Sequence, residues 1–322
     1  MEQAKIPGGW AIFKTAFSFY KSHLKIVGGL WLVPTVLGVA GTLVTIVPNP
    51  LLGLVSILLS FTSGILYTMA FAATILYVHH ASSEDTLRSL YKKGTHLFFP
   101  MLWVYLLQYL VTLGLITVAG VLGGAVGVAL WAVTLPQSAA FVSGFVVFSI
   151  ATLALTIAAS IYLIFSLYVK ILDGGDNFPA MARSWTYAQG KVWTIAGRGI
   201  VFGFFAILPF ILGMILFFIT MPSALDPQYI DDPTSFNNSL PIVIFQLYLG
   251  VATGLFMNPL LTLSGYFLYK PIADAHVKAP DEDIQLERKR KKLFILSIVG
   301  PAALILFLVG LLLFSVAFPT LP

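Results

Sequence analysis

Long apolar stretches, separated by short polar segments, make up most of this chain. Seven are long enough to cross a bilayer as helices, at 26–47, 51–78, 97–119, 139–169, 192–220, 240–268 and 294–316. A helix rising about 1.5 Å per residue needs roughly 20 residues to cross about 30 Å of hydrocarbon. Among all seven stretches, the one Asp, Glu, Lys, Arg or His is Arg198. The pattern predicts an all-α, polytopic membrane protein with seven transmembrane helices.

The polar segments differ sharply in charge from one side of the predicted membrane to the other. With a cytoplasmic N-terminus, segments 1–25, 79–96, 170–191 and 269–293 lie inside and carry 17 of the 18 Lys and Arg residues. Short loops rich in Lys and Arg remain on the cytoplasmic side of a membrane. We therefore predict a multi-pass protein of the cell (plasma) membrane, with its N-terminus in the cytoplasm and its C-terminus outside.

Three of the inner segments share a short motif. A serine is followed two or three residues later by a tyrosine and seven residues later by a basic residue: Ser18, Tyr20 and Lys25; Ser89, Tyr91 and His96; Ser184, Tyr187 and Lys191. Each motif precedes an odd-numbered span, which indicates a repeated unit. We predict a pseudo-threefold parallel repeat over 10–80, 82–172 and 177–270, each unit an interfacial helix plus a helix hairpin, related by an axis along the membrane normal.

The interfacial helices are predicted from their amphipathic spacing. In the first, an apolar face opposes lysines, and that face consists of Trp10, Phe13, Phe17, Tyr20 and Leu24. The second is expected to begin at the N-caps Ser82 and Ser83, and the third after Asp176 and Asn177. Such helices lie in the interface with their basic side among anionic head groups. They either anchor the bundle or form a surface for lipids or partners.

The repeats define the expected domains. Residues 1–270 form a six-helix membrane module, 271–293 a charged cytoplasmic linker, and 294–322 an added C-terminal transmembrane helix. The linker ends in the basic run 288–292. Beside a hydrophobic helix, such a run is an inner-face anchor with a role in binding anionic lipid.

Composition narrows the chemistry that is available. Hydrophobic residues account for 58% and charged residues for 10%, and there is no cysteine, which excludes disulfides, thiolate metal sites and cysteine nucleophiles. No H-E-x-x-H or G-x-S-x-G motif is present, and the adjacent His79 and His80 point to different helix faces. We expect no catalytic residue, no metal and no cofactor. The basic residues border hydrophobic helices, so we also expect no nucleic-acid partner.

Few polar groups lie within the predicted spans. The intramembrane polar candidates are the amides Gln108, Gln246 and Asn258, which serve as interhelical hydrogen bonds or as ligand contacts. Pro259 removes a helix hydrogen bond and frees the carbonyl of Leu255, which shapes either a pocket or a kink. No buried carboxylate is available for ion-coupled transport.

Two further features have alternative interpretations. Glycine-rich segment 120–138 either extends the third span outward or dips back as a re-entrant element. We favour an outer-leaflet helix packed closely on its neighbours and ending at Trp131 and Pro136. Arg198 is expected to reach back to the inner interface, or otherwise to pair with a phosphate or with Asp173 or Asp176.

The third interfacial helix carries the site hypothesis. It combines a guanidinium with interfacial indoles, and the proposed lipid head-group residues are Arg183, Trp185, Lys191, Trp193 and Arg198. We expect them to hold an anionic lipid head group at the inner face. The alternative is that Arg183 pairs locally with Asp173 or Asp176 while the tryptophans only anchor the helix.

The same region carries a family resemblance. The residues concerned are Asp173, Phe178, Ala180, Arg183, Ser184, Trp185, Gly190, Lys191 and Trp193. They resemble the "A-x-x-R-S-W … G-x-x-W" signature of a bacterial and archaeal family that includes YciC-like proteins and the membrane domain of some glycerophosphodiester phosphodiesterases. Pro259, Leu260, Tyr266 and Tyr269, before Lys270, resemble its closing element.

The resemblance covers about 10–270 and implies a six-helix membrane module. The seventh span departs from that pattern. We expect no phosphodiesterase domain, so that activity is not carried over. The leading hypothesis is a non-enzymatic integral membrane module of a prokaryotic envelope that organises lipid or partner proteins, for example as an accessory subunit of an envelope or export system. The alternative is an uncoupled permease or lipid transporter.

Overall fold

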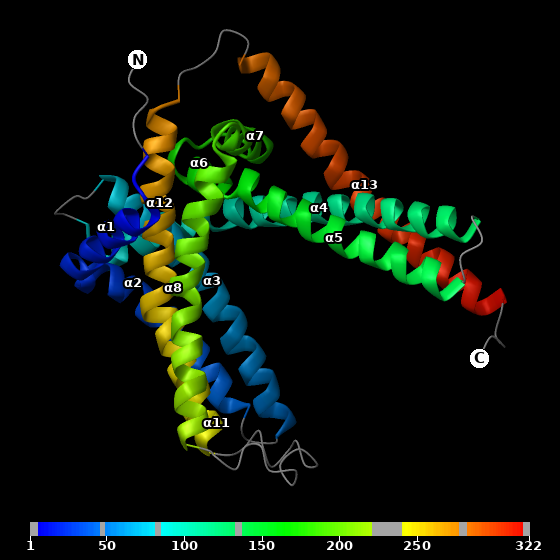
Figure 1. The fold of residues 1–322 in the computed structure, drawn as a ribbon. Helices are drawn as coiled ribbons and strands as arrows, with labels where there is room; N and C mark the ends of the chain where they lie inside the picture. The colour runs from blue at the N-terminus through cyan, green and yellow to red at the C-terminus, as the bar shows by residue number, and fades with distance from the viewer. Residues whose placement is uncertain are drawn as a thin grey trace. The chain divides into compact units, whose positions relative to one another are not determined.

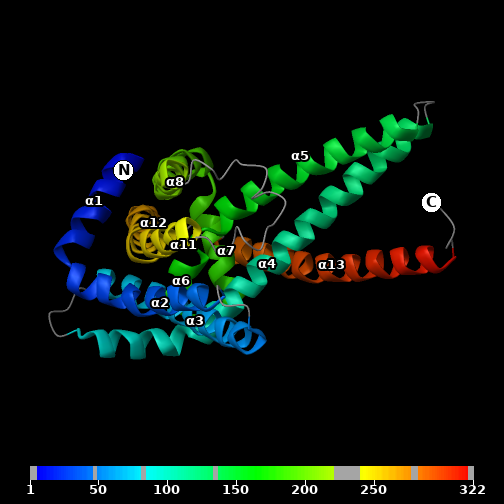
Figure 2. The same cartoon turned by 90° about the horizontal axis from the view of Figure 1, so that it is seen from below.

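The computed structural model describes residues 6–45, 49–80, 85–132, 137–220, 240–276 and 282–317, and these residues form helices and no strand (Figures 1 and 2). The all-α class is therefore confirmed. The chain divides into two compact units. The first comprises Met1–Phe99 and Trp193–His276, and the second comprises Pro100–Val192 and Val277–Pro322.

The first unit contains helices from both of its sequence segments. They are α1 (Gly9–Ser22), α2 (Leu24–Val44), α3 (Pro50–His80), the start of α4 (Leu87–Ala132), α8 (Val192–Thr220), α11 (Leu240–Val251), the π-helix η2 (Ala252–Met257) and α12 (Asn258–Asp274). The second unit contains the rest of α4, α5 (Gln137–Leu163), α6 (Ser166–Leu172), α7 (Asn177–Ala188) and α13 (Glu282–Ala317).

Six helices among the described residues are long and apolar enough to cross a membrane. They are Leu24–Val44, Pro50–His80, Leu87–Leu130, Val142–Leu172, Val192–Phe217 and Val243–Asp274. They correspond to the first six predicted spans, so the chain has the architecture of a multi-pass membrane protein. The seventh predicted span, 294–316, lies in α13, which runs as one helix from Glu282. The count of seven remains a prediction.

The predicted interfacial helices differ in their outcome. The first and third are separate helices, α1 and α7, whereas residues 87–96 are simply the first turns of α4. The predicted caps Ser82 and Ser83 lie outside the described residues. In α1 the buried positions are Ile12, Ala16 and Tyr20, while Trp10 and Phe17 of the predicted apolar face are exposed. The threefold repeat therefore also remains a prediction.

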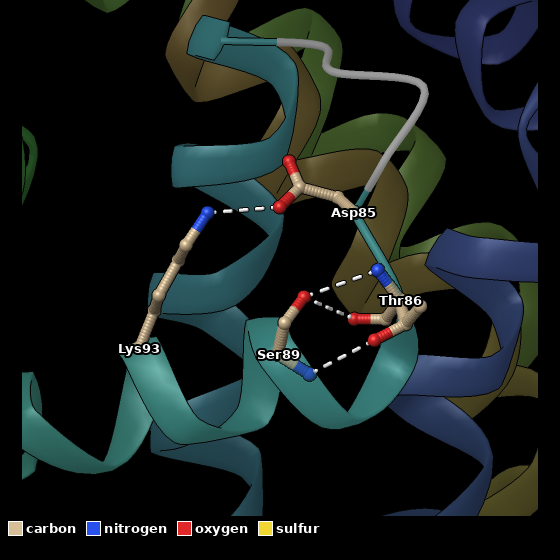
Figure 3. Close-up of polar contacts among 4 residues, drawn as sticks. All are labelled: Asp85, Thr86, Ser89 and Lys93. Atoms are coloured by element: carbon tan, nitrogen blue, oxygen red, sulfur yellow. Dashed lines mark hydrogen bonds and ion pairs between the residues drawn. The ribbon is translucent and has the colours of Figure 1, made fainter.

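The start of α4 is fixed by a reciprocal cap (Figure 3). The Thr86 N–H donates to Ser89 Oγ at 3.0 Å, and the Ser89 N–H donates to Thr86 Oγ1 at 3.2 Å. Lys93 Nζ pairs with Asp85 at 2.8 Å. These contacts satisfy backbone donors that the first helical turn leaves unpaired. They define where the helix that carries Tyr91 begins.

The glycine-rich segment extends the third span. Residues 120–132 continue α4, and α5 returns alongside it (Figure 2). A Cβ on Gly123 would lie 2.7 Å from the Gly144 carbonyl oxygen, and one on Gly144 would lie 3.2 Å from Gly127 Cα. The segment is thus a closely packed helix that continues the third span to Ala132, and its outer-leaflet position stays a prediction. The Trp131 side chain and Pro136 lie outside the described residues.

Candidate functional site

In the first unit, two tyrosine hydroxyls donate hydrogen bonds to backbone carbonyls that lack their usual helical N–H donor because a proline stands four residues later. Pro259 has no N–H to offer the Leu255 carbonyl, and that carbonyl accepts a hydrogen bond from the Tyr20 hydroxyl at 2.5 Å. Pro34 stands in the same relation to the Leu30 carbonyl, which accepts from the Tyr91 hydroxyl. Burial raises the pKa of Tyr20 above its usual value, so its phenol remains a protonated donor.

The π-helix beside these bonds is packed without spare volume. A Cβ on Gly254 would meet Thr35 Oγ1 and would lie 2.6 Å from the Tyr67 hydroxyl. Tyr67 donates to Thr35 Oγ1 at 3.2 Å, which joins α3 to α2. The π-helix before Pro259 is therefore closely packed against α2 and α3 at Gly254.

Arg198 also makes its hydrogen bonds within the first unit. Its Nε donates to the Pro7 carbonyl at 2.6 Å, Nη2 to the Ile6 carbonyl at 2.8 Å, and Nη1 to the Thr194 carbonyl at 2.9 Å. The guanidinium thus ties the chain preceding α1 to α8. These contacts do not include Asp173 or Asp176, whereas the predicted reach to the inner interface stays a prediction. Trp193, also in this unit, is 89% exposed.

The other three predicted head-group residues belong to the second unit. Arg183 pairs with Asp173 at 3.6 Å, and both side chains are partly exposed, which matches the local alternative. The Trp185 ring lies 5.4 Å from that of Tyr162. Burial lowers the pKa of Lys191 from its usual value. The five residues are thus divided between the two units.

The intramembrane amides are placed on three different helices. Gln108 Nε2 donates to the Leu163 carbonyl at 2.9 Å, so it joins α4 to α5 as an interhelical hydrogen bond. Gln246 is partly buried in α11. Asn258 is the first residue of α12, and its carbonyl accepts from Thr262 Oγ1 at 2.8 Å.

The second unit contains an open cavity of about 670 Å³. Its apolar lining comes from α4, the start of α7 and α13: Trp103, Leu107, Phe178, Pro179 and Phe294. Its polar lining comes from α6, the start of α7 and α13: Lys170, Asp176, Asn177, Glu287, Arg290 and Lys291. We call this the α7–α13 cavity. One side suits hydrocarbon and the other suits a charged group.

Contacts between α7 and α13 hold the cavity in shape. Lys289 Nζ donates to Thr186 Oγ1 at 2.9 Å and to Gln189 Oε1 at 2.8 Å. The rings of Phe178 and Phe294 meet edge to face with centroids 5.7 Å apart. The sequence assigns the basic run to binding anionic lipid, which stays a prediction, and it did not predict the contacts of Lys289 with α7 and the residue that follows it.

The polar groups of the cavity are unevenly satisfied. Glu287 pairs with Arg290 at 3.0 Å and with Lys291 at 3.8 Å, while Lys170 Nζ donates to a backbone carbonyl. The Asn177 side-chain oxygen is buried and has no hydrogen-bond partner in the described part of the chain. Asp176, at the N-cap of α7, makes no side-chain cap bond. The cavity thus presents cations and carboxylates together.

Metal ligation finds no support among the described residues. No three His, Asp or Glu side chains there are grouped to hold an ion. His79 Nδ1 lies 3.0 Å from the Tyr266 hydroxyl, so this ring makes a hydrogen bond between α3 and α12 within the first unit.

Residues 152–312, which are 161 of the chain's 322 residues, match the family described as the membrane domain of glycerophosphoryl diester phosphodiesterase. No curated protein and no solved structure matches the chain. The match contains all of α6 and α7 and most of α13, and so includes most of the cavity lining. It also takes in the last helix, which the sequence interpretation had set outside the family pattern, whereas residues 10–151 fall outside it.

Proposed function

Because the chain belongs to the family of the membrane domain of glycerophosphoryl diester phosphodiesterase, we propose that it is a non-enzymatic integral membrane module that binds and organises membrane lipids. The family is that of a membrane domain rather than of the catalytic domain. The proposal concerns lipid binding first, and an organising role towards partner proteins follows from it. An accessory role in an envelope or export system is consistent with such a module.

The α7–α13 cavity is the observation that carries this proposal. Its volume of about 670 Å³ falls within the roughly 300–1,000 Å³ typical of small-molecule sites. Trp103 and Phe294 offer an apolar side for acyl chains, and Arg290 and Lys291 offer charge for a head group. A phospholipid has both parts, and few soluble metabolites do.

The charge pattern supports a position at the inner leaflet. Lys170, Arg290 and Lys291 come from segments whose Lys and Arg content predicts a cytoplasmic location. Juxtamembrane basic residues are attracted to anionic lipids at that surface. The cavity would therefore receive inner-leaflet phospholipid from the side.

Lipid extraction tests the proposal. The purified full chain, after prolonged exchange into lipid-free detergent, is expected to retain phospholipid in a stoichiometric amount, measured by mass spectrometry. The same protein, incubated with phospholipids and with glycerophosphodiesters, is expected to leave both intact. A folded protein that retains no phospholipid would contradict lipid binding, and turnover of either compound would contradict the non-enzymatic role.

A further inference from the structure

One side of the α7–α13 cavity is suited to a phosphate. Lys170, Arg290 and Lys291 line it, and the first turn of α7 contributes Asn177 and Phe178. The N-terminus of a helix has unpaired N–H groups and a positive partial charge, and no side chain caps this one. Guanidinium and ammonium groups add charge-assisted hydrogen bonds.

The same cavity also contains groups that a simple anion would leave unsatisfied. The carboxylates of Asp176 and Glu287 line the cavity beside these cations. Carboxylates repel a purely anionic ligand and attract a cationic group. The ligand that satisfies this side carries N–H donors and a positive charge.

We infer that the α7–α13 cavity is a site for phospholipids of the phosphoethanolamine class, with the phosphate on Lys170, Arg290 and Lys291 and the primary ammonium on the Asp176 carboxylate. This assignment rests on the proposed lipid-binding function. The acyl chains run along Trp103 and Phe294, whose rings suit the membrane interface. Glu287 remains the partner of the two α13 cations and keeps their side chains in place.

Two related head groups satisfy the cavity less well. Phosphocholine has the same charges, but its quaternary nitrogen has no N–H to donate to the Asp176 carboxylate. Phosphoglycerol has hydroxyl donors, but its net negative charge faces the carboxylate of Asp176. The cavity is therefore expected to select for the N–H donors and for the balance of charge.

Competition between lipids is the first test. The full chain is reconstituted with equal amounts of phosphatidylethanolamine, phosphatidylcholine and phosphatidylglycerol, and the retained lipid is identified by native mass spectrometry. Severalfold enrichment of phosphatidylethanolamine over both others is expected. Equal retention of phosphatidylcholine, or preferential retention of phosphatidylglycerol, would overturn the head-group assignment while leaving lipid binding intact. Retention of no lipid at all would contradict the proposed function itself.

Matched variants of α13 locate the site. Arg290→Gln with Lys291→Gln is expected to lower phospholipid retention severalfold. The control, Arg288→Gln with Lys292→Gln, removes the same charge from the same run at positions that do not line the cavity. If the two pairs lower retention equally, the effect is one of general charge and the site is wrong.

Variants of Asp176 test the ammonium contact. Asp176→Asn removes the carboxylate, so the preference for phosphatidylethanolamine over phosphatidylcholine should fall towards equality. Asp176→Glu keeps a carboxylate, so that preference should survive. An unchanged lipid preference in folded Asp176→Asn would overturn the assignment.

Discussion

The two units differ in what their charged side chains contact. In the first unit, Arg198 donates to the carbonyls of Ile6 and Pro7, as the Tyr20 hydroxyl does to the Leu255 carbonyl. In the second unit, three cations and two carboxylates line one open cavity: Lys170, Arg290, Lys291, Asp176 and Glu287. Charged groups that satisfy the backbone stabilise a fold, whereas charged groups that line a cavity can contact a ligand.

The shared serine–tyrosine–basic motif also serves different purposes in the two units. In the first unit, the Tyr20 and Tyr91 hydroxyls donate to carbonyls that lack a helical N–H donor because of a proline. In the second unit, the serine of the motif joins α7 to the end of α5 and the residues that follow it. Ser184 Oγ donates to the Tyr162 carbonyl at 2.8 Å and accepts from the Phe165 N–H at 3.1 Å. Similar sequence therefore does not imply an equivalent contact in each copy.

The largest effect on stability is expected at Gly254. In Gly254→Ala the new Cβ collides with Thr35 and Tyr67, and overpacking of this kind costs about 1–3 kcal/mol. The melting temperature in detergent should fall clearly. Gly64→Ala is the control, because a Cβ there meets nothing within 4 Å. Equal melting temperatures for the two variants would show that the first unit is not closely packed at the π-helix.

A smaller effect is expected from the tyrosine–proline pair. Tyr20→Phe removes the donor to the Leu255 carbonyl, whereas in a Pro259→Ala background residue 259 regains an N–H for that carbonyl. A double-mutant cycle on unfolding free energies should give a coupling of about 0.6–1.7 kcal/mol, the range of hydrogen bonds within membranes. Strictly additive effects would mean that the phenol does not replace the missing helix bond.

The smallest effect is expected from the exposed pair in the second unit. Asp173→Asn removes the partner of Arg183, and an exposed ion pair contributes about 1 kcal/mol or less, with further screening by salt. Arg183→Gln should likewise leave phospholipid retention unchanged, because Arg183 does not line the cavity. A large loss of retained lipid in Arg183→Gln would instead place the lipid site at the residues first predicted from the sequence.

Much of the fold follows from local sequence. Apolar length predicts the six candidate spans, and the third short helix begins at Asn177, one residue before its predicted start. The loss of a helix bond at Pro259 is also local, so the free Leu255 carbonyl could be anticipated. Its donor could not, because Tyr20 lies 235 residues away and the contact exists only once α1 packs on α12.

The cavity lay beyond sequence reasoning for the same physical reason. Lys170 and Arg290 are far apart in the chain, and they share one lining only because α7 packs against α13. The five residues first proposed for a head group are adjacent in sequence, yet Arg198 turns to the backbone before α1 and Arg183 to Asp173. Their closeness in sequence shows that this region is rich in basic and aromatic residues. It does not show which of these side chains bond to the protein itself and which can contact a ligand.

Site-specific photo-crosslinking tests most directly the claim that the second unit binds lipid and the first does not. A photoreactive phenylalanine is placed at Phe294 in the cavity, or at Phe204 on α8, where the side chains are 51% and 62% exposed. Each protein is purified into lipid-free detergent and then irradiated. The account predicts a phospholipid adduct at position 294 and none at position 204. Equal adducts at both positions, or an adduct at 204 alone, would contradict it.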